Sequence, residues 1–219
     1  MATTHPDQPV SNVPLPNDRL PDVEPVRRTP LPLAAQPARW LEGWRAADAA
    51  GRVMAPLSRA LARPPLDRWT LGKTLGHAIH PALTDLPIGF WTSAVTLDVI
   101  GGPDARRSAQ QLLGIGTLSA LPTALTGVAE WDQIPRPESR VATAHAALNG
   151  VAMVLFAGSY VARRRGRYAV GVGLGLAASV PATAAGVLGG HLTGVRHVGI
   201  RDPAYNADDV GPQVQRPTS

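Results

Sequence analysis

The 219-residue chain contains no cysteine. Disulfides, thiolate zinc sites and cysteine-ligated iron–sulfur clusters therefore cannot form within it. An HExxH motif is also absent, which leaves zinc hydrolase chemistry with little support. The net charge is +5, and almost all of the positive charges are arginines. No basic stretch is interleaved with aromatic residues, a pattern that would favour a nucleic-acid module. We expect no nucleic-acid partner.

Charged residues are missing from long stretches of the chain. No Asp, Glu, Lys or Arg occurs at 108–129, 141–162 or 168–190, and the stretch 86–103 carries only Asp98. Each of the three uncharged stretches is long enough to cross a bilayer as a helix, which takes roughly 20 residues. A helix of a soluble bundle would need a polar face, which these stretches lack. The sequence therefore predicts an all-α integral membrane protein.

Four membrane helices are predicted, and short loops connect them. The first expected span begins between residues 81 and 87 and ends near 101–104. The other three cover about residues 108–131, 140–162 and 168–192. Because short loops make consecutive helices antiparallel neighbours, an up-and-down four-helix bundle is the expected architecture.

The segments around this membrane domain, 66–200, differ in composition. Residues 1–37 contain nine prolines and few large apolar side chains, so we predict a disordered tail there, and a second one at 201–219. Residues 38–65 place Trp and Leu on one helical face and Arg on another. This pattern is typical of a helical segment lying in the membrane interface, with a helix packed on a soluble surface as the alternative. Pro56 is expected to divide the segment.

The distribution of arginine predicts the orientation. The loops at 104–107 and 163–167 are arginine-rich and fall at the same end of the predicted bundle, whereas the loop at the other end holds only Arg136 and Arg140. The positive-inside rule places the two arginine-rich loops in the cytoplasm. The opposite orientation stays open, because we expect no signal peptide to export the N-terminal segment.

Two acidic residues and three tryptophans near the membrane boundary also lead to expectations. Thr84 or Asp85 is predicted to cap the first helix. Asp98 is expected to exit to the interface or to pair with Arg106 or Arg107, and we assign it no catalytic role. Three indoles suit the headgroup boundary of a membrane: Trp69, Trp91 and Trp131.

Four histidines fall at one level of the predicted bundle, at the end opposite the arginine-rich loops. His77 and His80 precede the first helix, His145 opens the third and His191 closes the fourth, with Glu130 at the same level. Neutral imidazole binds haem iron, zinc or copper, and facing helices build such sites in bundles. A haem b needs one axial histidine from each of two helices and no cysteine. We predict His145 and His191 as the axial pair, with His80 as the substitute.

Two more residues accompany the histidines. Asn149 lies one turn from His145 on the same helical face, where it can hydrogen-bond a ligand. Gly190 ends a stripe of small residues that would let a flat cofactor approach, although ordinary helix packing produces the same stripe. Each histidine also suits an interfacial position without ligating anything, in which case no cofactor is bound.

Four motifs occur in order along the membrane region: GHAIHPALTDLPIGFWTSA at 76–94, TGVAEW at 126–131, HAALN at 145–149 and GGHL at 189–192. In these motifs the chain resembles a bacterial family of uncharacterised four-helix membrane proteins, domain of unknown function 2231. Members are often joined to a Rieske iron–sulfur domain, so the resemblance implies a redox neighbourhood. It implies a separate Rieske-type or other electron-transfer protein as partner, and it supplies no catalytic residue.

The leading hypothesis is a multi-pass bacterial membrane protein that holds haem b or another redox centre and works with an electron-transfer partner. A cofactor-free structural or scaffolding membrane protein is the alternative. Small-solute transport is weaker, because the spans lack a clear charged pathway or an inverted repeat. The sequence favours a protein that is not an enzyme. The lipid bilayer is an expected partner, and homo-oligomerisation stays open.

Overall fold

The computed structural model describes residues 33–199, whose regular secondary structure is helical. Its elements are η1 Leu33–Ala35, α1 Gln36–Glu42, η2 Arg45–Ala47, α2 Asp48–Leu61, α3 Asp67–Thr70, α4 His80–Ile100, η3 Pro103–Ala105, α5 Arg106–Glu130, η4 Trp131–Gln133, α6 Glu138–Arg164, α7 Tyr168–Gly190 and η5 His191–Val195. Residues 33–37 are thus helical although their composition predicts a disordered tail. The rest of that tail and the segment 201–219 lie outside the described residues.

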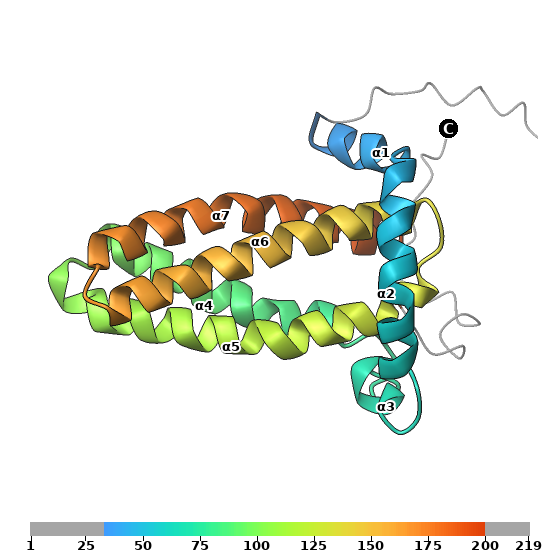
Figure 1. Cartoon of the computed structure of the whole chain (residues 1–219), viewed down its shortest axis with the longest axis horizontal. Helices are drawn as coiled ribbons and strands as arrows, with labels where there is room; N and C mark the ends of the chain where they lie inside the picture. The colour runs from blue at the N-terminus through green and yellow to red at the C-terminus, as the bar shows by residue number, and fades with distance from the viewer. Residues whose placement is uncertain (1–32, 200–219) are drawn as a thin grey trace, which may run out of the picture. The chain divides into compact units, whose positions relative to one another are not determined.

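The four long helices form two antiparallel hairpins. α4 packs along α5, and α6 packs along α7 (Figure 1). The hairpins meet in an apolar core in which the Trp91 ring stacks on Phe156, with 4.4 Å between ring centroids and 16° between ring planes. Trp91 is therefore a core residue, and its predicted place in an interfacial belt is wrong.

Three helical segments are long and apolar enough to cross a membrane: Pro103–Gln133, Glu138–Arg164 and Tyr168–Val195. α5 alone has 25 residues, or about 37 Å at 1.5 Å per residue, against a hydrocarbon core of roughly 30 Å. α4, whose 21 residues include His80, Asp85 and Asp98, is not among these segments. The predicted class of all-α membrane protein is confirmed, and a fourth span stays a prediction.

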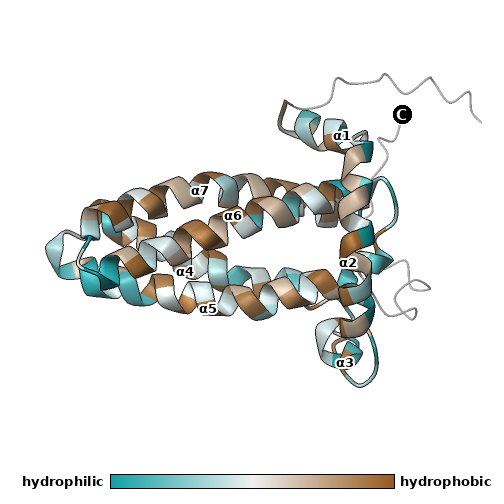
Figure 2. Cartoon of the chain, viewed as in Figure 1, coloured by the Kyte–Doolittle hydropathy of each residue, from teal (hydrophilic) through white to brown (hydrophobic). Residues whose placement is uncertain are grey.

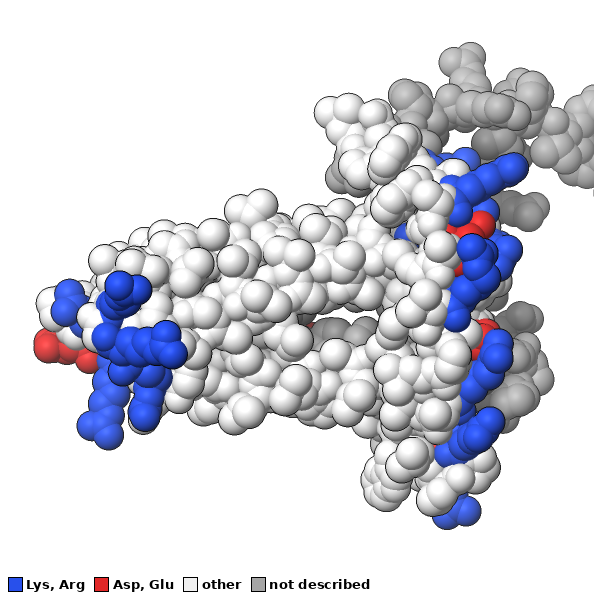
Figure 3. All heavy atoms as spheres, in the orientation of Figure 1, with Lys and Arg blue, Asp and Glu red and all other residues white. Residues whose placement is uncertain are grey.

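The surface of the helices between their ends is suited to lipid. Large apolar side chains are exposed on all three candidate spans, among them Leu118, Val154 and Val180. Hydrophobic stretches, drawn in brown, recur along these helices (Figure 2). Lysine and arginine gather at the two ends of the bundle, and the face seen between them carries none (Figure 3). This separation of basic residues from apolar surface matches a bilayer crossed by α5, α6 and α7.

A helical cap covers one end of the bundle. α2 lies across that end and contacts α5, η4 and α6, while α1 contacts α6 (Figure 1). The Ser58 hydroxyl fixes α2 there, donating to the Ala129 carbonyl at 3.1 Å and accepting from the Asp132 backbone N–H at 3.0 Å. Pro56 lies inside α2 without dividing it, and the break in the cap falls between α1 and α2 instead.

The N-terminus of α4 is not capped as predicted. The helix begins at His80, with Ile79 as N-cap and no capping side chain, so Asp85 lies within the helix. The Thr84 hydroxyl donates to the Pro81 carbonyl at 2.6 Å. The prediction that Thr84 or Asp85 caps this helix is wrong because the helix starts earlier than the prolines suggest.

Asp98 is paired inside the bundle. Arg163 Nη1 donates to Asp98 Oδ1 at 2.7 Å, and the Tyr168 hydroxyl donates to the same oxygen at 2.8 Å. The guanidinium of Arg106, one of the expected partners, lies 4.7 Å from the Tyr168 ring centroid instead. The expected pairing of Asp98 with Arg106 or Arg107 is therefore wrong, because the last turn of α6 presents Arg163 to the core.

An apolar groove separates α4 from α7. Its volume is about 740 Å³, and Trp91, Val95, Ala182 and Gly186 are among the residues that line it. The two hairpins therefore leave space between them on this side, alongside the part of α7 that precedes the histidine level.

Candidate functional site

His80 and His145 come together inside the bundle, beneath the cap. His80 is the first residue of α4, and His145 lies in the second turn of α6. Their ring centroids are 6.4 Å apart, and the ring planes are perpendicular. The structure therefore brings together one histidine from each hairpin.

The same kind of hydrogen bond fixes both rings. His80 Nδ1 lies 2.9 Å from the Thr123 carbonyl of α5, and His145 Nδ1 lies 2.8 Å from the Ala185 carbonyl of α7. A carbonyl oxygen can only accept, so each Nδ1 carries the proton and donates it. In the neutral rings, Nε2 of both histidines is then left with its lone pair.

Asn149 adds a contact to one of these rings. Its Nδ2 donates to His145 Nε2 at 3.0 Å, across one turn of α6. His80 Nε2 makes no hydrogen bond within the described residues. The Nε2 lone pair of His145 therefore accepts a hydrogen bond from an amide, whereas that of His80 accepts none within the described residues.

Two glycines make room for the rings. A Cβ added at Gly127 would lie 2.7 Å from His80 Cε1, and one added at Gly189 would lie 3.1 Å from His145 Cε1. At Gly190, the glycine singled out from the sequence, an added Cβ would meet nothing within 4 Å. The residue that packs against a histidine is therefore its neighbour, Gly189, and the motifs TGVAEW and GGHL hold the two glycines that matter.

Glu130 is a buried carboxyl group at the same level. It ends α5 and lies beside the backbone N–H of His80. Its Oε1 is buried and has no hydrogen-bond partner among the residues described. An unpaired polar atom in the interior is costly and usually has a reason, so Glu130 belongs with His80 in any account of this site.

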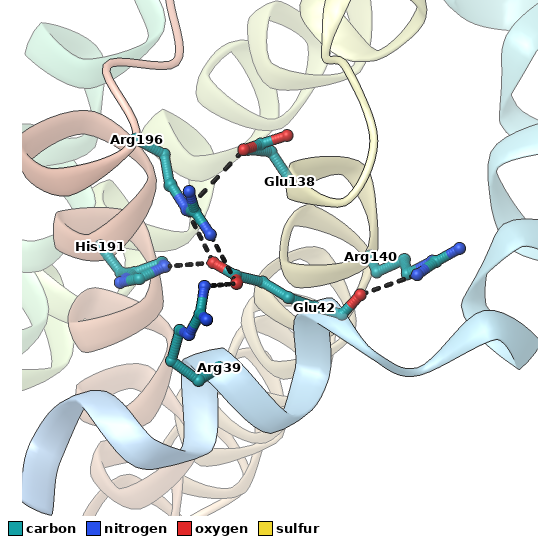
Figure 4. A network of polar contacts seen from close by, with 6 residues as sticks. All are labelled: Arg39, Glu42, Glu138, Arg140, His191 and Arg196. Atoms are coloured by element: carbon teal, nitrogen blue, oxygen red, sulfur yellow. Dashed lines mark hydrogen bonds and ion pairs between the residues drawn. The ribbon is translucent and has the colours of Figure 1, made fainter. Parts of the chain in front are cut away.

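His191 faces the cap and bonds to Glu42. Its Nε2 lies 3.0 Å from Glu42 Oε1, and Arg196 and Arg39 bind the same carboxylate (Figure 4). Glu42 is only 6% exposed. Burial would raise the pKa of Glu42, but hydrogen bonds from Arg196 and His191 outweigh it and hold the pKa below its ordinary value.

This network ties the cap to the bundle. Figure 4 shows Arg140 of α6 reaching the backbone carbonyl of Glu42, at 2.7 Å, and Arg196 also approaching Glu138. Glu42 and His191 are 149 residues apart in the sequence. Sequence reasoning missed Glu42 because it looks like a surface residue of an amphipathic helix.

His77, the remaining predicted ligand, is separate from the His80–His145 pair. His77 is exposed, and its Nδ1 lies 2.9 Å from the adjacent Ala78 carbonyl. Within residues 33–199, no three His, Cys, Asp or Glu side chains form a group that could hold a metal ion. A site using only two histidines does not need such a group.

The part of the chain that holds these histidines matches a known protein family. Residues 76–202 match a family model described as a predicted membrane protein (DUF2231). The chain belongs to the DUF2231 family. The resemblance carried by the four sequence motifs is thereby confirmed. No curated protein and no solved structure matches this DUF2231 chain.

The family match covers one part of the candidate site and not the other. α4 to α7 lie inside it, with the His80–His145 pair and Glu130. The cap, including Glu42 and α2, lies outside it. In this DUF2231 protein, the histidine pair is therefore part of the family region, whereas the residue that holds His191 comes from the preceding segment.

Proposed function

We propose that this DUF2231 protein is a redox protein of the bacterial plasma membrane, in which His80 and His145 hold a haem b. A separate electron-transfer protein, such as a Rieske-type carrier, would exchange electrons with it. The observation that carries the proposal is the anchoring of both rings through Nδ1–H to backbone carbonyls. Proteins orient metal-binding histidines in this way, which leaves Nε2 for the metal.

The residues around the pair suit such a group. The two imidazoles come from different hairpins, so they could bind a haem from two sides. A b-type haem needs no cysteine in the protein. Gly127 and Gly189 keep side chains away from the rings, and Gly186 of the apolar groove lies one turn before Gly189 on α7. A bound haem would supply one-electron chemistry, and the chain would hold it, orient it and exclude water. The Asn149 amide would turn away from His145 Nε2 when the site is filled.

His191 is not one of the two proposed haem ligands. Glu42 holds its Nε2 at 3.0 Å and is itself held by two arginines. Ligation by His191 would break a buried ionic network, whereas His80 Nε2 makes no hydrogen bond within the described residues that ligation would break. The proposal therefore pairs His145 with His80, the histidine that the sequence offered as the substitute.

We also propose that α4 crosses the membrane as a fourth span. α4 carries Asp98, but that carboxylate is paired with Arg163 and Tyr168 inside the bundle. A paired charge facing the interior does not contact lipid. α4 also packs along α5, which is itself apolar enough to span. With four spans, the loops at 104–107 and 163–167 would be cytoplasmic by the positive-inside rule.

Absorption spectroscopy of the whole chain tests the haem proposal. The protein is expressed with added haem precursor and purified in detergent, and oxidised and reduced spectra are recorded. We expect b-type bands in the wild type and in His77→Ala, and their loss in His80→Ala and in His145→Ala. His191→Gln should keep them, because its ring bonds to Glu42. A colourless wild-type protein, or bands that survive in the His80→Ala/His145→Ala double variant, would overturn the proposal.

A cofactor-free scaffold is the second candidate, and the cap favours it. Trp40 and Trp44 stack at 6.3 Å and are exposed, and Trp69 of α3 is 71% exposed. Such indoles suit the membrane interface or a partner protein. If the protein is a scaffold, His80→Ala and His145→Ala should leave partner binding and stability almost unchanged, while replacement of Trp40 and Trp44 should weaken partner binding.

A further inference from the structure

A polar cleft lies between α2 and the start of α6, on the cap side of the molecule. Its volume is about 270 Å³. Most of its polar lining is charged: Asp48, Arg52, Arg59, Asp132 and Arg136. None of these residues belongs to the histidine pair or to the proposed haem site.

Both acids in the cleft are already neutralised. Arg140 binds Asp48 through two nitrogens, at 2.9 and 3.1 Å, and Arg59 binds Asp132 through two nitrogens, at 3.0 and 3.4 Å. Two more arginines line the cleft, Arg52 and Arg136, and neither forms an ion pair within the described part of the chain. The cleft therefore has an excess of positive charge and of N–H donors.

A buried donor without an acceptor adds a second, independent observation. Trp131 lines the cleft and is only 7% exposed, and its Nε1 has no hydrogen-bond partner among the described residues. It lies against Gly51 of α2, where an added Cβ would be 3.5 Å from it. An indole N–H can only donate, so this site lacks an acceptor. The predicted interfacial role of Trp131 is replaced by a buried one.

We propose that this cleft binds a phosphate group. Arginine guanidinium groups match the geometry of phosphate oxygens, and the unpaired indole N–H supplies a further donor. The phosphate belongs either to the headgroup of an anionic lipid or to a free phosphate ion.

Thermal unfolding of the full chain in detergent tests this site. The ligands are short-chain phosphatidylglycerol, short-chain diacylglycerol, which has the same tails without the phosphate, and inorganic phosphate, with sodium chloride to match ionic strength. A ligand that binds only the folded protein raises the unfolding midpoint as its concentration rises. We expect phosphatidylglycerol, inorganic phosphate or both to raise the midpoint, and diacylglycerol and sodium chloride to leave it unchanged.

Three variants locate the effect, and one controls for charge. Arg52→Gln and Arg136→Gln each remove an unpaired cation, and Trp131→Phe removes the N–H while it keeps an aromatic ring. Each should reduce the phosphate-dependent shift by at least half. Arg45→Gln, an exposed arginine of the cap outside the cleft, should keep the full shift. The proposal is overturned if no phosphate compound raises the midpoint, or if the shift is unchanged in all three cleft variants. A shift with inorganic phosphate alone assigns the site to free phosphate, and one with phosphatidylglycerol alone assigns it to lipid.

Discussion

Arg163 and Asp98 form an ion pair in the interior of the bundle, with their side chains 0% and 1% exposed. The pair joins the last turn of α6 to the end of α4 and so links the two hairpins. Ser159 and Tyr168 complete its hydrogen bonds. A buried pair of this kind is costly to break from one side, since the charge that remains has no partner.

Arg163→Gln or Asp98→Asn should each lower the free energy of unfolding by roughly 3–5 kcal/mol, which is typical of a buried pair broken on one side. The double variant should lose less than the sum of the two, because it leaves no unpaired charge. Denaturant unfolding in detergent measures all three. Asp104→Asn, an exposed acid in the next loop, is the control and should change little. Additive losses would show that the two residues do not act as a pair.

Gly127→Ala should disturb the histidine pair directly. The new methyl group would lie 2.7 Å from His80 Cε1, so we expect a loss of roughly 1–3 kcal/mol of stability from overpacking. If the haem proposal holds, the b-type absorption should fall as well. Gly150→Ala is the matched control in α6, because nothing lies within 4 Å of its added Cβ. It should be neutral or gain up to about 1 kcal/mol, as helix propensity predicts.

The Glu42 network should make the cap sensitive to acid. Because the pKa of Glu42 is lowered in the folded protein, its stabilising effect is full above its ordinary pKa of about 4.3 and is lost as pH falls through the lowered value. Arg39, His191 and Arg196 are the charged or titratable groups that face it. The test is the unfolding midpoint measured from neutral pH downwards.

Glu42→Gln removes this dependence and serves as the comparison. It keeps the shape of the side chain but loses the charge that the two arginines bind, so it should lower stability at neutral pH by roughly 1–3 kcal/mol. Its acid-induced loss of stability should then be smaller than that of the wild type. Equal losses in both proteins would place the acid sensitivity elsewhere.

Cysteine labelling tests the number of spans, because the native chain has no cysteine to interfere. Single cysteines are introduced at four exposed positions, Thr74, Asp104, Gln133 and Arg165, and treated with a membrane-impermeant maleimide in intact cells. With four spans and cytoplasmic arginine-rich loops, Thr74→Cys and Gln133→Cys should be labelled, and Asp104→Cys and Arg165→Cys should not. If Thr74→Cys behaves like Asp104→Cys, α4 does not cross the membrane.

The long helices could be predicted from the sequence because their signal is local. The sequence predicts that the third and fourth helices begin at about residues 140 and 168, and α6 and α7 begin at Glu138 and Tyr168. Uninterrupted apolar stretches mark such helices without knowledge of their neighbours. The predicted start of α4 is too late, because the helix accommodates both Pro81 and Pro87.

The partners of the polar residues could be predicted only in part. The topology placed His80, His145 and His191 at one level, but it did not determine which way each ring faces. That choice depends on the rotation of each helix and on Glu42, which lies in a segment with no sequence signal for burial. Asp98 shows the same limit, because its partner Arg163 is 65 residues away, whereas Arg106 and Arg107 follow within ten.

The position of α2 has a consequence for how the protein is made. α2 is translated before any of the four long helices, yet the surfaces it contacts belong to α5, η4 and α6. At about 5–20 residues per second, α2 leaves the ribosome several seconds before α6 is complete. α2 therefore cannot complete its contacts until α6 has been synthesised, although α2 itself precedes all four long helices.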